Sequence, residues 1–247
     1  MEPLLAPAPP GPTASAVPPS PGIGTDGVRP DRLSAIGLCA AWSRHAAELA
    51  VPIGTALQRW EETPPTRVLI AEGYLMRLLP GRYVPPDLLG TAVQRALGLG
   101  CALGAQLQSH HVIAGPSAAW VMLGGQPPAP AELLSSAHRG DVAGVVMRTA
   151  RLQPDEVETI GGTPITIPTR TAMDLLRFTP VPVAAPLLRA LVATGHTEVE
   201  EVRRRLHRMH RHPGVQSARE RLEKVLGGQW DESWDAAPTG LPSAVTR

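Results

Sequence analysis

Apolar residues recur at helical spacing in the early part of the chain. Residues 33–50 place alanines, leucines and Trp42 on one face, which predicts a helix. Pro52 then opens a second short helix, because the first helical position needs no backbone N–H, and Leu57 and Trp60 lie on one face of it. Two short helices therefore precede a pair of prolines that is expected to break the chain.

A third helix and a hairpin are expected next. Residues 68–72 predict a short helix that Gly73 caps, since glycine readily adopts the left-handed conformation that ends many helices. The proline–glycine pair at residues 80–81 is a β-turn signal between two short strands at residues 74–79 and 82–84. Short helices followed by a small hairpin are the element order of a winged helix-turn-helix domain.

Strand and helix patterns alternate in the following stretch. The expected elements are a helix that begins at Asp87, a strand at residues 112–114, a helix at 117–123 and, after a proline-rich loop, a strand at 142–150. Residues 158–160 and 163–167 predict a second hairpin. Pro164 and Pro168 are expected to place its second strand at a sheet edge, because proline cannot donate a ladder hydrogen bond.

Three further helices are expected toward the end of the chain. A capping box of Thr171 and Asp174 opens the first, and the second covers residues 186–193. The third covers residues 197–211, where Thr197 is the expected cap. The predicted fold class is therefore α+β, with an N-terminal winged helix-turn-helix followed by a small mixed α/β C-terminal domain.

Composition sets the domain boundaries. The first thirty residues contain nine prolines and cannot bury enough apolar surface to offset chain entropy, so residues 1–30 are predicted to be a disordered tail. Residues 31–86 form the winged-helix-like domain, residues 87–226 the α/β domain and residues 227–247 a flexible tail. The first residues lack the basic start and the unbroken apolar run of a signal peptide. The apolar stretch near residues 97–105 is too short to span a bilayer, so a cytoplasmic protein is expected.

Charge and cysteine content narrow the classes of partner. The net charge is +1, so any binding to nucleic acid must depend on local patches of arginine. Lys224 is the one lysine among 23 basic residues. Cys39 and Cys101 lie far apart without a partner spacing, which indicates two reduced thiols in a cytosolic protein.

Arginines flank the predicted hairpin and fill one side of the helix at residues 197–211. In a winged helix the hairpin lies against the DNA backbone, where arginines position the domain without reading bases. The helix could likewise bind phosphates, and ordinary solvated surface charge is the alternative for both groups. The candidate DNA-binding residues are Arg67, Arg77, Arg82, Tyr83, Arg203, Arg204, Arg208 and Arg211.

Signatures of catalysis are weak throughout the sequence. His207, His210 and His212 have no Cys, Asp or second histidine cluster to complete a metal site. The glycines at positions 98, 100 and 104 have the wrong spacing for a dinucleotide loop and follow a helix where a strand is required. Asp155, Glu156 and Glu158 are expected to be exposed in a turn. The sequence therefore predicts a non-enzymatic protein without cofactor or metal.

Three segments together resemble a known family. They are Leu-Met-Arg-Leu-Leu-Pro-Gly-Arg-Tyr-Val-Pro at residues 75–85, Ser-Ala-Ala-Trp at 117–120 and Gly-Thr-Pro-Ile-Thr-Ile-Pro-Thr-Arg-Thr-Ala-Met-Asp-Leu at 162–175. Their order and spacing resemble the AbiEi-type antitoxins of type IV (abortive-infection) toxin–antitoxin systems, in their actinobacterial form. The chain departs from that family at residues 121–123, where a histidine is common. No Asp…Glu-x-Lys arrangement follows Lys224, so the endonuclease-like domain of many relatives is not expected here.

The resemblance implies a transcriptional autoregulator. Such proteins bind double-stranded operator DNA through the winged helix, here with Arg77, Arg82 and Tyr83 on the wing motif, and the C-terminal domain counteracts a nucleotidyltransferase-type toxin. The first hypothesis is therefore a non-enzymatic DNA-binding antitoxin-like regulator. The second is a protein-interaction module with a degenerate DNA-binding half, and a nuclease-related protein with residual activity is the third.

Overall fold

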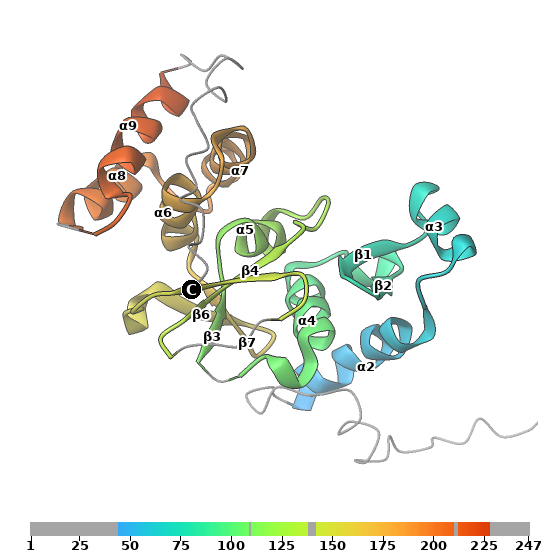
Figure 1. Ribbon diagram of the computed structural model, residues 1–247. Helices are drawn as coiled ribbons and strands as arrows, with labels where there is room; N and C mark the ends of the chain where they lie inside the picture. The colour runs from blue at the N-terminus through green and yellow to red at the C-terminus, as the bar shows by residue number, and fades with distance from the viewer. Residues whose placement is uncertain (1–43, 109, 138–141, 210–211, 228–247) are drawn as a thin grey trace, which may run out of the picture.

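The computed structural model describes residues 44–108, 110–137, 142–209 and 212–227 of the 247-residue chain. This part of the chain is an α+β protein with a five-stranded sheet and a separate two-stranded hairpin (Figure 1). Residues 1–30 and 228–247 of the two predicted tails lie outside the described residues. None of the helices within the described ranges has the length and apolar character that a bilayer crossing requires.

Helix α2 (Arg44–Arg59) is continuous, with Pro52 in its interior. The prediction that a new helix begins at Pro52 is therefore wrong. Ala46, Ala50, Ile53 and Leu57 are all buried at helical spacing, and the helix packs on α4 (Ala92–Leu103). This tertiary packing outweighs the hydrogen bond that an interior proline removes, a local cost of about 3 kcal/mol.

Helix α3 (Pro64–Ala71) begins at the two prolines that the sequence predicts to be a chain break. Proline suits the first turn, where the N–H groups have no helical partner, and the hydroxyl of Thr63 accepts a hydrogen bond from the Thr66 N–H. Gly73 follows the helix with φ +81°, which confirms the predicted glycine cap. Of the eight residues of α3, Thr66 is buried, so most of this helix faces solvent.

The first predicted hairpin is confirmed. Strands β1 (Met76–Leu79) and β2 (Arg82–Val84) pair antiparallel around Gly81, whose φ of +69° suits a residue without a Cβ. Leu78, Leu79, Tyr83 and Val84 are buried and fix the hairpin to the core.

The cap of α4 differs from the prediction. A 3-10 turn, η1 (Pro86–Leu89), follows the hairpin, and Thr91 rather than Asp87 caps α4, in a capping box with Gln94. Gly98 lies inside this helix, and a Cβ built on it would lie 2.7 Å from Leu89 Cδ2. Gly98 therefore allows α4 to pack closely against η1, and η2 (Gly104–Gln106) follows the end of α4.

The strand order of the sheet is β5-β4-β3-β7-β6. The strands are β3 (His111–Ile113), β4 (Ala131–Ser135), β5 (Val145–Thr149), β6 (Val157–Ile160) and β7 (Thr163–Thr166), joined by η3 (Pro154–Glu156) before β6. β3 pairs antiparallel with β4 and parallel with β7, β4 pairs parallel with β5, and β6 pairs antiparallel with β7.

Two sheet predictions are wrong. The sequence pattern predicts a loop where β4 lies, although β4 is an inner strand. Pro164 predicts an edge position for β7, yet this strand lies between β3 and β6. The proline is tolerated because β7 pairs with β3 at a single position, Ile165 opposite Ile113, whereas Pro164 lies opposite Thr159 of β6.

Helices cover the sheet and extend from one end of it. These are α5 (Gly115–Leu123), α6 (Pro168–Phe178), α7 (Val181–Ala193), α8 (Val199–Arg208) and α9 (Val215–Leu226). α5 packs on β4 and on α6, and Figure 1 shows α6 to α9 grouped on the side of the molecule away from α2 and α3. A continuous apolar core runs from Ala46 to Val225.

Two predicted helix caps are also wrong. α6 begins at Pro168, so Thr171 and Asp174 lie inside it, and the Thr171 hydroxyl bonds to Thr166 instead. α8 begins after Glu198, and the hydroxyl of Thr197 lies 2.9 Å from the hydroxyl of Thr169. α7 begins at Val181, five residues before the predicted start, and α9 is an element that the sequence pattern did not predict.

Candidate functional site

Three of the predicted DNA-binding arginines are exposed on the N-terminal helix and hairpin. Arg67 lies on α3, Arg77 on β1 and Arg82 on β2. None of them forms an ion pair with a carboxylate of the described residues, so their charges face solvent. α3 and the hairpin are joined by a tight turn in which the Tyr74 N–H donates to the Leu69 carbonyl at 2.8 Å. We call the exposed side chains of α3 and the hairpin the helix–hairpin face.

Tyr83 does not belong to this surface. Its side chain is 1% exposed in the core, and burial, together with a hydrogen bond to Glu62, raises the pKa of its hydroxyl. The prediction that Tyr83 contacts DNA beside Arg82 is corrected accordingly. In β2 the two side chains point in opposite directions, so Tyr83 anchors the strand while Arg82 is presented to solvent.

The helix–hairpin face also contains exposed apolar side chains. Val68 on α3 is 54% exposed, and Tyr74, at the turn into the hairpin, is 66% exposed. Isolated exposed residues are ordinary, but here a valine and an aromatic ring lie on the same short unit as three arginines that have no ion pair with a described carboxylate. Such a mixture can contact either a phosphate backbone or another protein.

The predicted arginines of α8 have different surroundings from one another. Arg203 pairs with Glu200 and, at 2.8 Å, with Glu223 of α9, and Arg204 pairs with Glu201 at 2.7 Å. Both charges are compensated by neighbouring carboxylates. Arg208 is exposed and has no ion pair with a described carboxylate, whereas Arg211 lies outside the described residues.

A buried ionic cluster lies beneath α8. Arg170 of α6 is 3% exposed; its Nε lies 3.0 Å and 3.1 Å from the two carboxylate oxygens of Asp174, and its Nη1 lies 2.8 Å from Glu156. Arg177 Nη1 lies 3.7 Å from Asp174. Burial raises the pKa of Asp174, although the two guanidinium groups oppose this shift. Burial lowers the pKa of Arg170, but Asp174 and Glu156 raise it by more, so the net shift is upward.

This cluster is absent from the functional residues that the sequence predicts. The available signal was the i, i+4 spacing of Arg170 and Asp174, which places the two side chains on the same face of a helix. The third member, Glu156, comes from a separate segment of the chain, and its contact with Arg170 depends on the tertiary structure.

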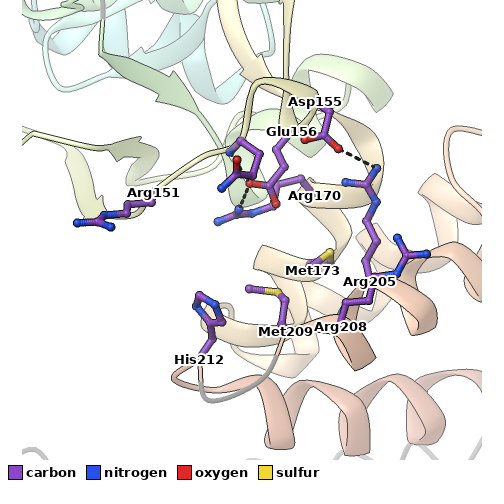
Figure 2. Close-up of a pocket in the computed structure, with 10 residues that line it drawn as sticks. Arg151, Asp155, Glu156, Arg170, Met173, Arg205, Arg208, Met209 and His212 are labelled. Carbon is purple, nitrogen blue, oxygen red and sulfur yellow. Dashed lines mark hydrogen bonds and ion pairs between the residues drawn. The ribbon is translucent and has the colours of Figure 1, made fainter.

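A polar cavity of about 320 Å³ adjoins this cluster (Figure 2). We call it the arginine pocket; its lining residues are Arg151, Gln153, Asp155, Glu156, Arg170, Met173, Arg205, Arg208, Met209 and His212. They come from the segment between β5 and β6, from α6, and from α8 and the residues that follow it. Asp155 is exposed as the sequence predicts, whereas the side chain of Glu156 is largely buried through its bond to Arg170.

A second cavity, of about 470 Å³, lies beside β4 and α6. Glu132 reaches it from β4 and accepts a hydrogen bond from Arg148 at 3.1 Å, and burial raises the pKa of its carboxyl although Arg148 opposes the shift. The hydroxyl of Thr179, which also lines this cavity, is buried without a partner. The remaining lining side chains are apolar: Pro116, Pro128, Ala129, Pro130, Val146, Phe178, Pro180 and Val183.

Groups that could bind a metal do not come together within the described ranges. No set of three His, Cys, Asp or Glu side chains with suitable placement occurs there. Cys101 packs against α2, where burial raises the pKa of its thiol to about 12, and Cys39 lies outside the described residues. Burial also lowers the pKa of His111 in β3.

Comparison of the chain with models of protein families, with curated proteins and with solved structures gives no match.

Proposed function

We propose that this protein is a DNA-binding transcriptional autoregulator of the antitoxin type, and that it acts by binding rather than by catalysis. In this proposal α2, α3 and the β1–β2 hairpin form a winged helix-turn-helix domain. The observation that carries the proposal is the exposure of Arg67, Arg77 and Arg82 on the helix–hairpin face without a compensating carboxylate among the described residues.

The geometry suits contact with a phosphate backbone. Arginine is the preferred ligand for phosphate oxygens because its planar group donates several hydrogen bonds. Arg77 and Arg82 lie on the two strands of a short hairpin that Tyr83 and Val84 anchor in the core, so little conformational freedom of the backbone is lost on binding. The resemblance of residues 75–85 to the wing motif of AbiEi-type antitoxins supports operator DNA as the ligand and a nucleotidyltransferase-type toxin as the functional partner.

A mobility-shift assay with the DNA upstream of this protein's own gene tests the proposal. The double variant Arg77→Gln, Arg82→Gln should bind more weakly to every sequence, and its salt dependence should fall by about 1 per lost phosphate contact. Arg44→Gln is the matched control, because Arg44 is equally cationic but lies on α2 and pairs with Glu48. Equal affinity and equal salt dependence in the wild type and the double variant would refute the DNA-binding face.

The exposed side chains of Val68 and Tyr74 favour a second candidate function, a protein-interaction module. In that case the helix–hairpin face contacts a protein partner such as the toxin, and DNA binding is absent or weak. The variant Val68→Ser, Tyr74→Ser distinguishes the two functions. It should leave the mobility shift unchanged if the face binds DNA backbone through arginines, and it should weaken binding to purified toxin if the face binds protein.

A further inference from the structure

The arginine pocket has more positive charge than its own carboxylates compensate. Arg170 is held by Glu156 and Asp174, and Arg205 by Glu201 at 2.7 Å with Asp155 at 3.6 Å. Two further cations, Arg151 and Arg208, line the cavity without an ion pair to any described carboxylate. An anionic ligand in the cavity could therefore contact guanidinium groups that have no carboxylate partner among the described residues.

The side chains are arranged around the cavity in a distinctive order. Figure 2 shows Arg151 and His212 on one side of the pocket, Arg205 and Arg208 on the other, and two methionines, Met173 and Met209, between them. One small anion would reach one cationic side and leave the other unused. A ligand with two anionic groups and a flat aromatic part that branches off between them would satisfy both sides, because thioether sulfur makes favourable contacts with aromatic rings.

We propose that the arginine pocket binds a nucleoside that carries a phosphate on each side. One phosphate contacts Arg151 and His212, the other contacts Arg208, and the base lies on Met173 and Met209. The volume of about 320 Å³ is at the lower end of the range for small-molecule sites, which suits one nucleotide unit. A free nucleoside bisphosphate and one unit of a single-stranded nucleic acid share this chemistry. The proposal is independent of DNA binding by the helix–hairpin face.

Titration calorimetry of the full chain at low ionic strength tests the site. Adenosine 3′,5′-bisphosphate is the probe, and adenosine 5′-monophosphate, adenosine and inorganic phosphate are the comparison ligands. The bisphosphate should bind about tenfold more tightly than the monophosphate, because each charge-assisted hydrogen bond contributes roughly that factor. Arg151→Gln and Arg208→Gln should each remove this advantage.

Arg204→Gln is the matched control. Arg204 lies on the same helix as Arg208 and loses the same charge, but it pairs with Glu201 and does not line the pocket. The affinity of the Arg204→Gln variant for the bisphosphate should equal that of the wild type. Affinity for the bisphosphate no greater than for adenosine, or an equal loss in Arg204→Gln and Arg208→Gln, would overturn the proposal.

A short single strand distinguishes the two sources of the ligand. The probe is pentathymidylate, measured with the wild type and with the two pocket variants. If the strand binds, and if Arg151→Gln and Arg208→Gln both weaken this binding, the ligand is a nucleic-acid strand. Binding of the bisphosphate alone, with the same sensitivity to both variants, identifies a free nucleotide.

Discussion

Replacement of Asp174 by asparagine should destabilise the protein severely. The Asp174 side chain is fully buried and compensates Arg170, which is itself 3% exposed, through two oxygen contacts at 3.0 Å and 3.1 Å. It also lies 3.7 Å from Arg177. The substitution Asp174→Asn would keep the shape of the side chain but remove the negative charge, so the variant isolates the electrostatic part of the interaction.

The magnitude follows from what the substitution leaves behind. Glu156 would remain as the one carboxylate bonded to Arg170, at 2.8 Å, and the positive charge of Arg177 would lose its buried partner. Breaking a buried pair typically costs about 3 to 5 kcal/mol, because an uncompensated charge stays in the interior. Burial also raises the pKa of Asp174, so removing its charge relieves some desolvation, but the guanidinium groups of Arg170 and Arg177 that stay in the interior outweigh this gain. Since small domains are stable by about 5 to 15 kcal/mol in total, this loss is a large fraction of the free energy of unfolding.

Urea denaturation of the full chain, followed by circular dichroism, measures this difference. Glu200→Gln is the control: Glu200 also pairs with an arginine, but its side chain is 72% exposed, and exposed pairs contribute less than about 1 kcal/mol. Should the Asp174→Asn variant not fold, Glu156→Gln removes the outer partner of Arg170 and should show an intermediate loss. A loss below about 1 kcal/mol in the Asp174→Asn variant, or one equal to the control, would refute the reasoning.

Three further predictions concern other parts of the fold. Because burial raises the pKa of Glu132, the folded state holds this proton to higher pH than the unfolded chain does. Glu132→Gln should therefore gain stability relative to the wild type as the pH rises above about 4, and a relative loss in urea titrations would contradict this. Cys101 should resist iodoacetamide at about pH 8 in the native protein and react in urea, because burial raises the pKa of its thiol to about 12. Peptide mass spectrometry measures the modification, and labelling of the native protein would contradict the prediction. Gly144→Ala should lower the free energy of unfolding by roughly 2 to 4 kcal/mol, because Gly144 has φ +76° and a Cβ would overlap the ring of Pro80. An unchanged melting temperature would contradict this prediction.

Local signals in the sequence determined many of the elements. The proline–glycine turn of the first hairpin, the cap at Gly73 and the paired glycines after α5 all require backbone conformations that few other residues adopt. The α+β class and the presence of helices before the hairpin also follow from spacing, although the predicted helix boundary at Pro52 is wrong. The exposure of Arg77 and Arg82 does not follow from simple alternation, because buried residues are consecutive in both strands and the register shifts between Arg77 and Leu79.

Tertiary packing decided the elements that local rules misjudged. Pro52 and Pro186 lie inside helices because buried neighbours hold those helices against the core. The pattern of β4 does not indicate a strand, because its buried Glu132 resembles a surface residue until Arg148 of the neighbouring strand is placed beside it. Sequence spacing cannot give this information, since the strands meet only when the sheet forms.

The candidate sites divide in the same way. The sequence by itself identified the arginines of the hairpin and of α8, because residue type and spacing are local properties. The tertiary structure decided that Tyr83 is a core residue, that Arg203 and Arg204 have carboxylate partners, and that Arg208 shares a cavity with Arg151. The physical reason is that the energy of a charge depends on its burial and on the charges within a few ångströms, and both are set by contacts between segments distant in the chain.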